Sequence, residues 1–176
     1  RKVEFLGKMP DPFLKEDGTR MTPAEWAENR EAIKKKVVEM EFGEIPPRPE
    51  VVEFEQLNML TRNHVGTWYK IYAGTKEKQV SFTLELNIPA ATMEKHPVVL
   101  TGDACYANME SDVIKEAMRR GYIAARFNRL ELANDVKGSR EGGLHRVYPD
   151  VRFTDIGAWA WGYMVCMDVF EKLDFV

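Results

Sequence analysis

The sequence predicts an α/β fold with a mixed sheet, in which antiparallel strands come first and parallel strands joined by crossover helices follow. Residues 80–88 alternate apolar and polar side chains without a fault, as antiparallel strands with one buried face commonly do. Two short apolar runs, 97–100 and 122–127, flank a helical pattern at 110–120. Strand, helix and strand in this order indicate two parallel strands joined by a right-handed crossover.

The segments before residue 80 predict two further strands and an N-terminal helix. The strands are expected at about 51–57 and 67–73. Thr22 followed by Pro23 and Glu25 predicts a helix start, because the threonine caps the helix and the glutamate reaches back to it. We therefore expect an N-terminal arm and helix at 1–50, packed on a body that comprises residues 51–176.

The last helical pattern begins near Gly157 and carries Trp159 and Trp161 in an almost uncharged stretch. A helix that is apolar on nearly every face must be covered on nearly every face, which predicts a larger body than these 176 residues supply. The neighbours of the two tryptophans favour core packing, and stacking on a sugar is the alternative. The sequence thus looks like the first part of a larger fold.

Composition excludes some partners and leaves the compartment open. The chain has 25 basic and 28 acidic residues, for a net charge of −3, which argues against nucleic acid or an anionic membrane as a partner. Its longest apolar run is too short to cross a bilayer. Two cysteines, Cys105 and Cys166, make no disulfide framework. A secreted and a cytoplasmic bacterial protein both remain open.

Ligand sites of open parallel sheets lie beyond the carboxyl ends of the strands, so residues 101–109 and 128–152 are the places to inspect. The backbone of the first segment can hold an oxyanion; alternatively, it is a plain turn in which Gly102 permits the bend and Asn108 caps the next helix. The second segment is long for a loop inside a domain, and such loops are commonly functional or mobile. For any single residue in it, a plain surface excursion is an equally good interpretation.

Other reactive residues give no convincing site. His64, His96 and His145 have no metal-ligand spacing and are expected on the surface or in loops. Cys105 can act as a nucleophile near a helix start, but a space-filling role is favoured, and Cys166 is expected in the core. No phosphate-binding glycine pattern, zinc motif or Gly-x-Ser-x-Gly turn is found. We expect no cofactor and no metal.

Several motifs, taken together in their order and spacing, resemble one family, the glucuronoyl esterase and acetyl xylan esterase-like α/β-hydrolases. The N-terminal matches are Met-Pro-Asp-Pro-Phe at 9–13, Asp-Gly-Thr-Arg at 17–20, Trp26, Arg30 and Glu-Phe-Gly-Glu-Ile-Pro-Pro at 41–47. The later matches are Pro-Val-Val-Leu at 97–100, Arg-Gly-Tyr at 120–122, Phe-Asn-Arg at 127–129 and Gly-Ala-Trp-Ala-Trp-Gly at 157–162.

The resemblance implies the N-terminal part of an α/β-hydrolase fold and a serine esterase that acts on acyl or glucuronoyl esters of plant cell-wall polysaccharide. In the family the nucleophilic serine follows the Trp-rich helix, in a Gly-x-Ser-Arg-x-Gly-Lys-like turn, and the acid and histidine come later. No such turn occurs up to Val176, so the resemblance implies that all three catalytic residues lie beyond it, and none of the three histidines matches the catalytic one. It further implies an oxyanion or site wall at Asp103, Ala104, Cys105 and Tyr106, and a flanking loop at Asn128 and Arg129.

Two functions follow from this reasoning. The first is the N-terminal part of a carbohydrate esterase that lacks the triad and is inactive alone; its substrate, once complete, is a carbohydrate ester. We expect its partner to be a complementary C-terminal part or a second copy, because the strand position next to 122–127 is left open and Trp159, Trp161, Tyr163 or Met164 is exposed. The alternative is a non-catalytic glycan- or protein-binding module that uses residues 128–152.

Overall fold

The computed structural model describes residues 11–61, 65–89, 95–106 and 111–176. The chain forms two compact units, residues 1–40 and 41–176, and each is described by itself. The boundary expected after residue 50 stays a prediction.

The first unit contains most of helix α1 (Pro23–Glu41), which begins where the sequence predicts. The Glu25 carboxylate accepts the backbone N–H of Thr22 at 2.8 Å, and the Thr22 hydroxyl accepts the backbone N–H of Glu25 at 3.3 Å. This is the reciprocal cap that the threonine and glutamate predict. Lys15 donates to the same carboxylate, and Phe13 packs on Trp26 with their ring centres 4.6 Å apart.

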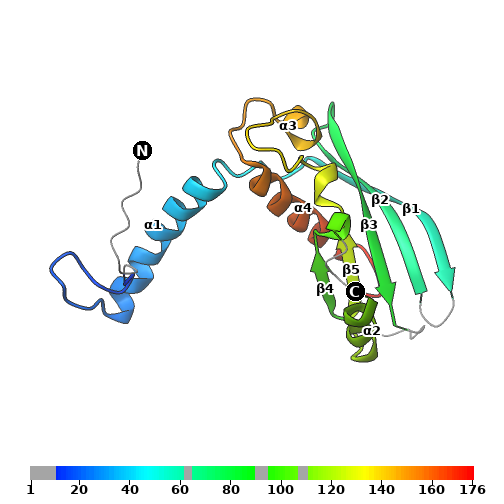
Figure 1. Ribbon diagram of the computed structural model, residues 1–176, viewed down its shortest axis with the longest axis horizontal. Coiled ribbons are helices and arrows are strands. Elements are labelled where there is room, and N and C mark those ends of the chain that lie inside the picture. The colour runs from blue at the N-terminus through cyan, green and yellow to red at the C-terminus, as the bar shows by residue number, and fades with distance from the viewer. Residues whose placement is uncertain (1–10, 62–64, 90–94, 107–110) are drawn as a thin grey trace. The chain divides into compact units, whose positions relative to one another are not determined.

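The second unit is built on one five-stranded sheet in the order β1-β2-β3-β5-β4. β1, β2 and β3 pair antiparallel, β3 pairs antiparallel with β5, and β4 pairs parallel with β5 (Figure 1). The mixed sheet predicted from the sequence is therefore confirmed. The strands are β1 (Val51–Thr61), β2 (Val65–Gly74), β3 (Gln79–Ile88), β4 (Val98–Thr101) and β5 (Ile123–Phe127).

The open edge of the sheet differs from the expected one. The open position is expected beside residues 122–127, but β5 lies between β3 and β4, so β4 is the edge strand on this side of the sheet. After β4, the chain passes through α2 (Ser111–Arg119) and then forms β5, which lies between β4 and β3. Strand order is set by pairing over long sequence distances, which local pattern does not encode.

Residues 128–152 are less of a loop than the sequence suggests. They contain the 3-10 turn η2 (Arg129–Glu131) and the short helix α3 (Gly143–Val147). Leu132 and Leu144 are fully buried, so part of this segment is core. The glycines and charged residues that indicate a loop surround apolar residues that pack beneath it.

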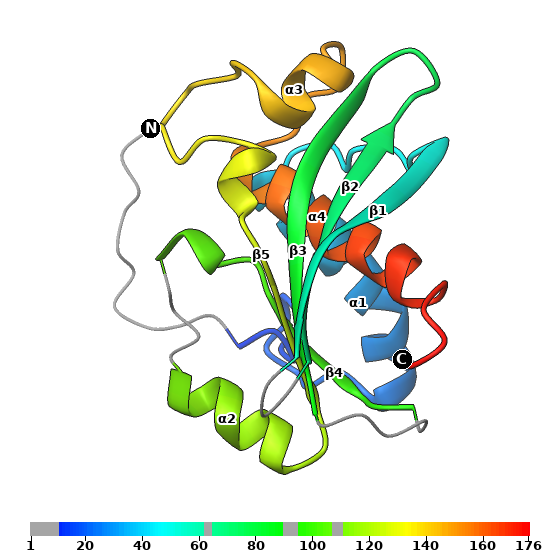
Figure 2. The same ribbon diagram turned by 90° about the vertical axis from the view of Figure 1, so that its right-hand side faces the viewer.

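The core lies between the sheet and helix α4 (Asp155–Phe170), which crosses one face of the sheet (Figures 1 and 2). Phe82, Leu84 and Leu86 on alternate positions of β3 are completely buried, as its alternating pattern predicts. Each such side chain contributes about 1.5–3 kcal/mol relative to an exposed one. From α4, Val165, Cys166 and Val169 are equally buried, which confirms Cys166 as a core residue.

Close packing on α4 requires Gly162. A Cβ atom at this position would lie 2.3 Å from Leu132 Cδ1 and 2.9 Å from Phe127 Cε2. The helix starts at Thr154, whose hydroxyl accepts the Gly157 N–H at 3.2 Å. Among the residues that the structure describes, no helix is long and apolar enough to cross a membrane.

Candidate functional site

The two segments that follow the parallel strands β4 and β5 meet at one edge of the sheet. Asp103 and Asn128 form an isolated antiparallel bridge, and the backbone N–H of Arg129 donates to the Gly102 carbonyl at 3.0 Å. The 3-10 turn η1, which comprises Ala104, Cys105 and Tyr106, follows directly. The residues expected to form a site wall and those expected to flank it are therefore neighbours.

The Arg129 side chain is the centre of this edge. Its Nη1 donates to Asp103 Oδ1, and its Nη2 lies 3.8 Å from Asp135 Oδ2. The guanidinium carbon lies 4.2 Å from the ring centre of Trp159, a cation–π distance. The Arg129 side chain is only 21% exposed, so solvent screens these contacts less than it screens surface ion pairs. Two carboxylates and an indole together fix the turn after β4 against the segment after β5.

Arg129 and its three partners Asp103, Asp135 and Trp159 form one cluster, the Arg129 cluster. Trp159 also packs against the core. Its Nε1 donates to the Ala133 carbonyl at 3.0 Å, and the side chain is half-buried. From the sequence, core packing is favoured for both tryptophans, with sugar stacking as the alternative. Trp161 is buried in the core, whereas one face of Trp159 is occupied by the Arg129 guanidinium. The Arg129–Trp159 pair joins residues 30 positions apart, and no local pattern signals it.

Gly102 is required for close packing. A Cβ atom there would lie 3.0 Å from Phe127 Cζ and 3.2 Å from the Tyr163 ring. Its N–H donates to the Tyr163 hydroxyl at 2.7 Å. Gly102 is expected to permit a bend, but its dihedral angle φ is not positive. The close approach of Tyr163 from α4 explains the glycine instead. Asn108, the expected cap of α2, lies outside the described residues.

Asn128 has a local structural role. Its side-chain oxygen accepts the Leu130 N–H at 3.0 Å and so caps η2. This cap holds the segment at the point where it leaves β5, next to the Arg129 cluster.

The expectation that His145 is a surface or loop residue is wrong. It is 4% exposed within α3, its Nε2 lies 3.0 Å from Asp155 Oδ1, and its ring stacks on Phe153 with centres 4.5 Å apart. A carboxylate and an aromatic ring from outside α3 make its burial favourable, and neither is visible as a local motif. His96 is half-buried in the segment before β4, with Nδ1 3.0 Å from the Gly121 carbonyl. His64 lies outside the described residues.

The two cysteines differ in environment. Cys105 is a half-exposed free thiol in η1. Burial raises the pKa of the Cys166 thiol well above its ordinary value, so this thiol stays protonated and unreactive. Within the described ranges, no three His, Cys, Asp or Glu side chains gather as a potential metal site.

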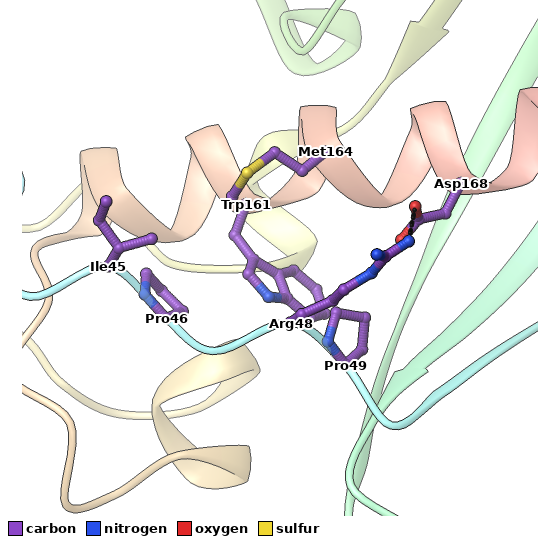
Figure 3. Close-up of a pocket in the computed structure, with 7 residues that line it drawn as sticks. All are labelled: Ile45, Pro46, Arg48, Pro49, Trp161, Met164 and Asp168. Atoms are coloured by element: carbon purple, nitrogen blue, oxygen red, sulfur yellow. Dashed lines mark hydrogen bonds and ion pairs between the residues drawn. The ribbon is translucent and has the colours of Figure 1, made fainter.

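A small cavity of about 320 Å³ lies where residues 45–49 run along α4 (Figure 3). The Trp161 indole points toward this segment, and its Nε1 donates to the Pro47 carbonyl at 2.9 Å. Arg48 reaches Asp168 at 3.0 Å. The segment thus covers a second face of α4, beside the face that packs on the sheet.

The mixed sheet, with a candidate site where the parallel strands β4 and β5 end, is part of an α/β-hydrolase fold. Comparisons with known proteins identify the family. The family model described as glucuronyl esterase of fungi matches residues 71–175. A curated relative, 4-O-methyl-glucuronoyl methylesterase 1 of Wolfiporia cocos, is 26% identical over 170 residues, which are 93% of this chain and 39% of the relative.

Solved structures show the same fold. A glucuronoyl esterase from Solibacter usitatus has a TM-score of 0.73 at 19% identity, with 96% of this chain and 55% of that chain covered. The glucuronoyl esterase from Sporotrichum thermophile has a TM-score of 0.61 at 24% identity, with 92% and 40% covered.

This chain belongs to the glucuronoyl esterase family, because the family model matches more than half of its residues. The resemblance stated from the sequence motifs is thereby confirmed. The chain spans between 39% and 55% of the length of the relatives described above.

Proposed function

We propose that this chain forms the N-terminal part of the catalytic domain of a glucuronoyl esterase, which hydrolyses esters of glucuronic acid on plant cell-wall polysaccharide. The match to the family at residues 71–175 carries this proposal. The absence of a Gly-x-Ser-x-Gly turn from the 176 residues supports placing the serine, the acid and the histidine in the part of the domain that this chain does not span.

In the proposed mechanism a histidine takes the proton of the serine, the serine attacks the ester carbonyl, and water then releases the acid. Backbone donors that hold the oxyanion lower the barrier by several kcal/mol, but they do not replace a nucleophile. We assign the wall at Asp103–Tyr106 and the flanking Asn128 and Arg129 to this site. These residues hold one side of the site in a fixed position, because the hydrogen bond from Arg129 to Asp103 joins the segment after β5 to the turn after β4.

The first test is activity of the purified chain. We expect no turnover of methyl glucuronate esters or acetyl esters and no labelling of Ser81, Ser111 or Ser139 by a fluorophosphonate. Extending the chain by the remainder of the esterase domain, in the same polypeptide or as a second one, should produce hydrolysis. Stoichiometric labelling of a serine in the chain alone would contradict the proposed position of the nucleophile.

The open side of the second unit supports a proposal for the partner. Among the residues that the structure describes, β4 pairs with a strand on one side only, and Val99 on it is 42% exposed. On α4, Ile156, Tyr163 and Met167 form an exposed stripe at helical spacing, being 49%, 36% and 55% exposed. The Tyr163–Gly102 hydrogen bond places this stripe beside the carboxyl end of β4.

We propose that the remainder of the esterase domain covers this surface, with a strand added beside β4 and a helix laid on the α4 stripe. The relatives indicate what covers the surface, because more than 40% of their length lies outside the part that matches this chain. Unpaired edges and apolar patches of this kind are normally covered. Sedimentation at micromolar concentration tests it: a 1:1 complex with the remaining part supports the proposal, whereas a self-associated form that excludes this part contradicts it.

The alternative function is a non-catalytic module that binds a glycan or a protein through residues 128–152. One observation supports glycan binding as an additional property, namely a cavity next to α3 that is lined by both polar and apolar side chains. Tight glycan binding by a chain that gains no esterase activity when extended would favour this alternative over the esterase.

A further inference from the structure

A broad cavity of about 810 Å³ lies between α3 and the turn that joins β2 to β3. Figure 2 shows α3 next to this turn. The volume falls in the range of roughly 300–1,000 Å³ that is typical of ligand pockets. Its lining includes Ser81, Glu131, Arg146, Val147 and Pro149.

The cavity lies at the same edge of the sheet as the Arg129 cluster. Phe127, the last residue of β5, pairs with Leu84, so the earlier residues of β3 extend beyond the carboxyl end of β5. Glu131, two residues after Arg129, accepts the Thr83 N–H at 2.9 Å on this extension. Ligand sites of α/β sheets lie at this edge, and the cavity borders the proposed reaction site.

The walls of the cavity are held in place by the fold. Glu131 Oε1 accepts Lys70 Nζ at 3.2 Å, while its other oxygen accepts Thr83. The Leu144 N–H donates to the Leu132 carbonyl at 2.7 Å, which anchors α3. Val147 is 6% exposed and contributes an apolar side chain to the wall of the cavity.

The charges that face the cavity favour an anion. Arg146 is exposed, and within the described ranges neither Arg146 nor Lys78 forms an ion pair. Lys70 offsets the charge of Glu131, which leaves Glu77 as the opposing carboxylate. The Ser81 hydroxyl and the Gln79 amide add neutral donors.

We propose that this cavity binds an acidic oligosaccharide, with the carboxylate of a uronic acid on Arg146 and Lys78 and an apolar sugar face on Val147 and Pro149. A guanidinium suits a carboxylate because it donates two parallel hydrogen bonds. The choice of a uronic acid as the source of the carboxylate rests on the proposed function. The cavity is then a second glycan-binding site next to the reaction site.

Amide chemical shifts of the ¹⁵N-labelled chain test this proposal directly. The chain is titrated with a xylo-oligosaccharide that bears glucuronic acid, with the same oligosaccharide without it, and with free glucuronate. We expect shifts at Ser81, Arg146 and Val147 with the acidic oligosaccharide, and an affinity that falls as salt is added.

Three variants test how the charges at the cavity affect the affinity for the acidic oligosaccharide. Arg146→Met should weaken binding about fivefold, because one charged hydrogen-bond donor is lost at an exposed position. Glu77→Gln should strengthen binding about twofold, since a like charge is removed. Arg119→Met on α2 is the matched control and should change nothing, because Arg119 pairs with Glu116 outside the cavity.

Three results would overturn the proposal: equal binding of the neutral oligosaccharide, free glucuronate that binds as tightly as the acidic oligosaccharide, or no effect of Arg146→Met. Esterase activity is not part of these measurements. If the extended chain hydrolyses no ester while the shifts appear as expected, the proposed function fails and the glycan site stands.

Discussion

The two long helices, α1 and α4, have similar lengths but different sources of stability. No residue of α1, which has 19 residues, is buried. Eight of the 16 residues of α4 are buried. α1 begins with a reciprocal cap between Thr22 and Glu25 that neighbours in sequence provide. α4 packs on the sheet, on residues 45–49 and on the segment after β5.

This difference predicts how strongly a substitution in each helix disturbs the unit that contains it. Isolated helices gain little from propensity and caps, and packing of an apolar face supplies most helical stability in proteins. A change in α4 should therefore affect the whole second unit, whereas a change at the start of α1 should remain local.

The substitution Trp161→Ala should destabilise the second unit by about 3–5 kcal/mol, the usual cost of removing a large buried aromatic side chain. Trp161 is 1% exposed, and its loss also leaves the Pro47 carbonyl without its donor. Chemical denaturation followed by circular dichroism measures the change in the free energy of unfolding.

Trp26→Ala on α1 is the matched control. Trp26 is half-buried against Phe13, and such an aromatic contact contributes only about 0.5–1.5 kcal/mol beyond its buried area. The unfolding midpoint of the second unit should not move. Equal effects of the two tryptophan substitutions on that midpoint would contradict the contrast between the helices.

The substitution His145→Ala should cost about 2 kcal/mol, because it removes a buried hydrogen bond to Asp155 and the stacking on Phe153. The effect is expected in the same unfolding transition as that of Trp161→Ala. Asp155→Asn keeps a hydrogen-bonding side chain at the start of α4 and should cost less. A larger loss for Asp155→Asn than for His145→Ala would show that the charge at the helix start outweighs the packing of the histidine.

The smallest effect concerns the pH dependence of the α1 cap. The hydrogen bonds from the Lys15 side chain and from the Thr22 backbone lower the pKa of Glu25 from 4.5 to about 2. A carboxylate whose pKa is lower in the folded state stabilises the fold above its unfolded pKa and loses this contribution as the pH falls. The first turn of α1 should therefore loosen as the pH falls from about 4.5 to about 2.

NMR of the Glu25 and Thr22 amides over this pH range measures the loosening. Glu25→Gln should remove the pH dependence, while the signals of α4 should not change over the same range. A pH response in α4 that follows the titration of Glu25 would show that the cap is not local.

Much of the fold is predictable from the sequence because it depends on neighbours along the chain. The alternation in β3, the cap at Thr22 and the two apolar runs each follow from local spacing, and the structure confirms them. The resemblance carried by short motifs gave the family correctly. The predicted site segments also meet, because parallel strands end at the same edge of a sheet.

Three features were decided by tertiary structure alone. β4 is the edge strand instead of β5, His145 is buried instead of exposed, and Arg129 stacks on Trp159. In each case a residue meets a partner from another element, and the sequence contains no local trace of that partner.

Outside residues 128–152, the amino-acid sequence alone predicts the strands and the longer helices, the mixed sense of the sheet and the family, since hydrophobic period, helix caps and motif order act over short distances. It does not predict η2 or α3. Only the tertiary structure decided the strand order, the buried histidine and the cavity beside α3. The physical reason is that burial and pairing depend on which distant surfaces approach each other, and that choice is made by the free energy of the whole packed unit.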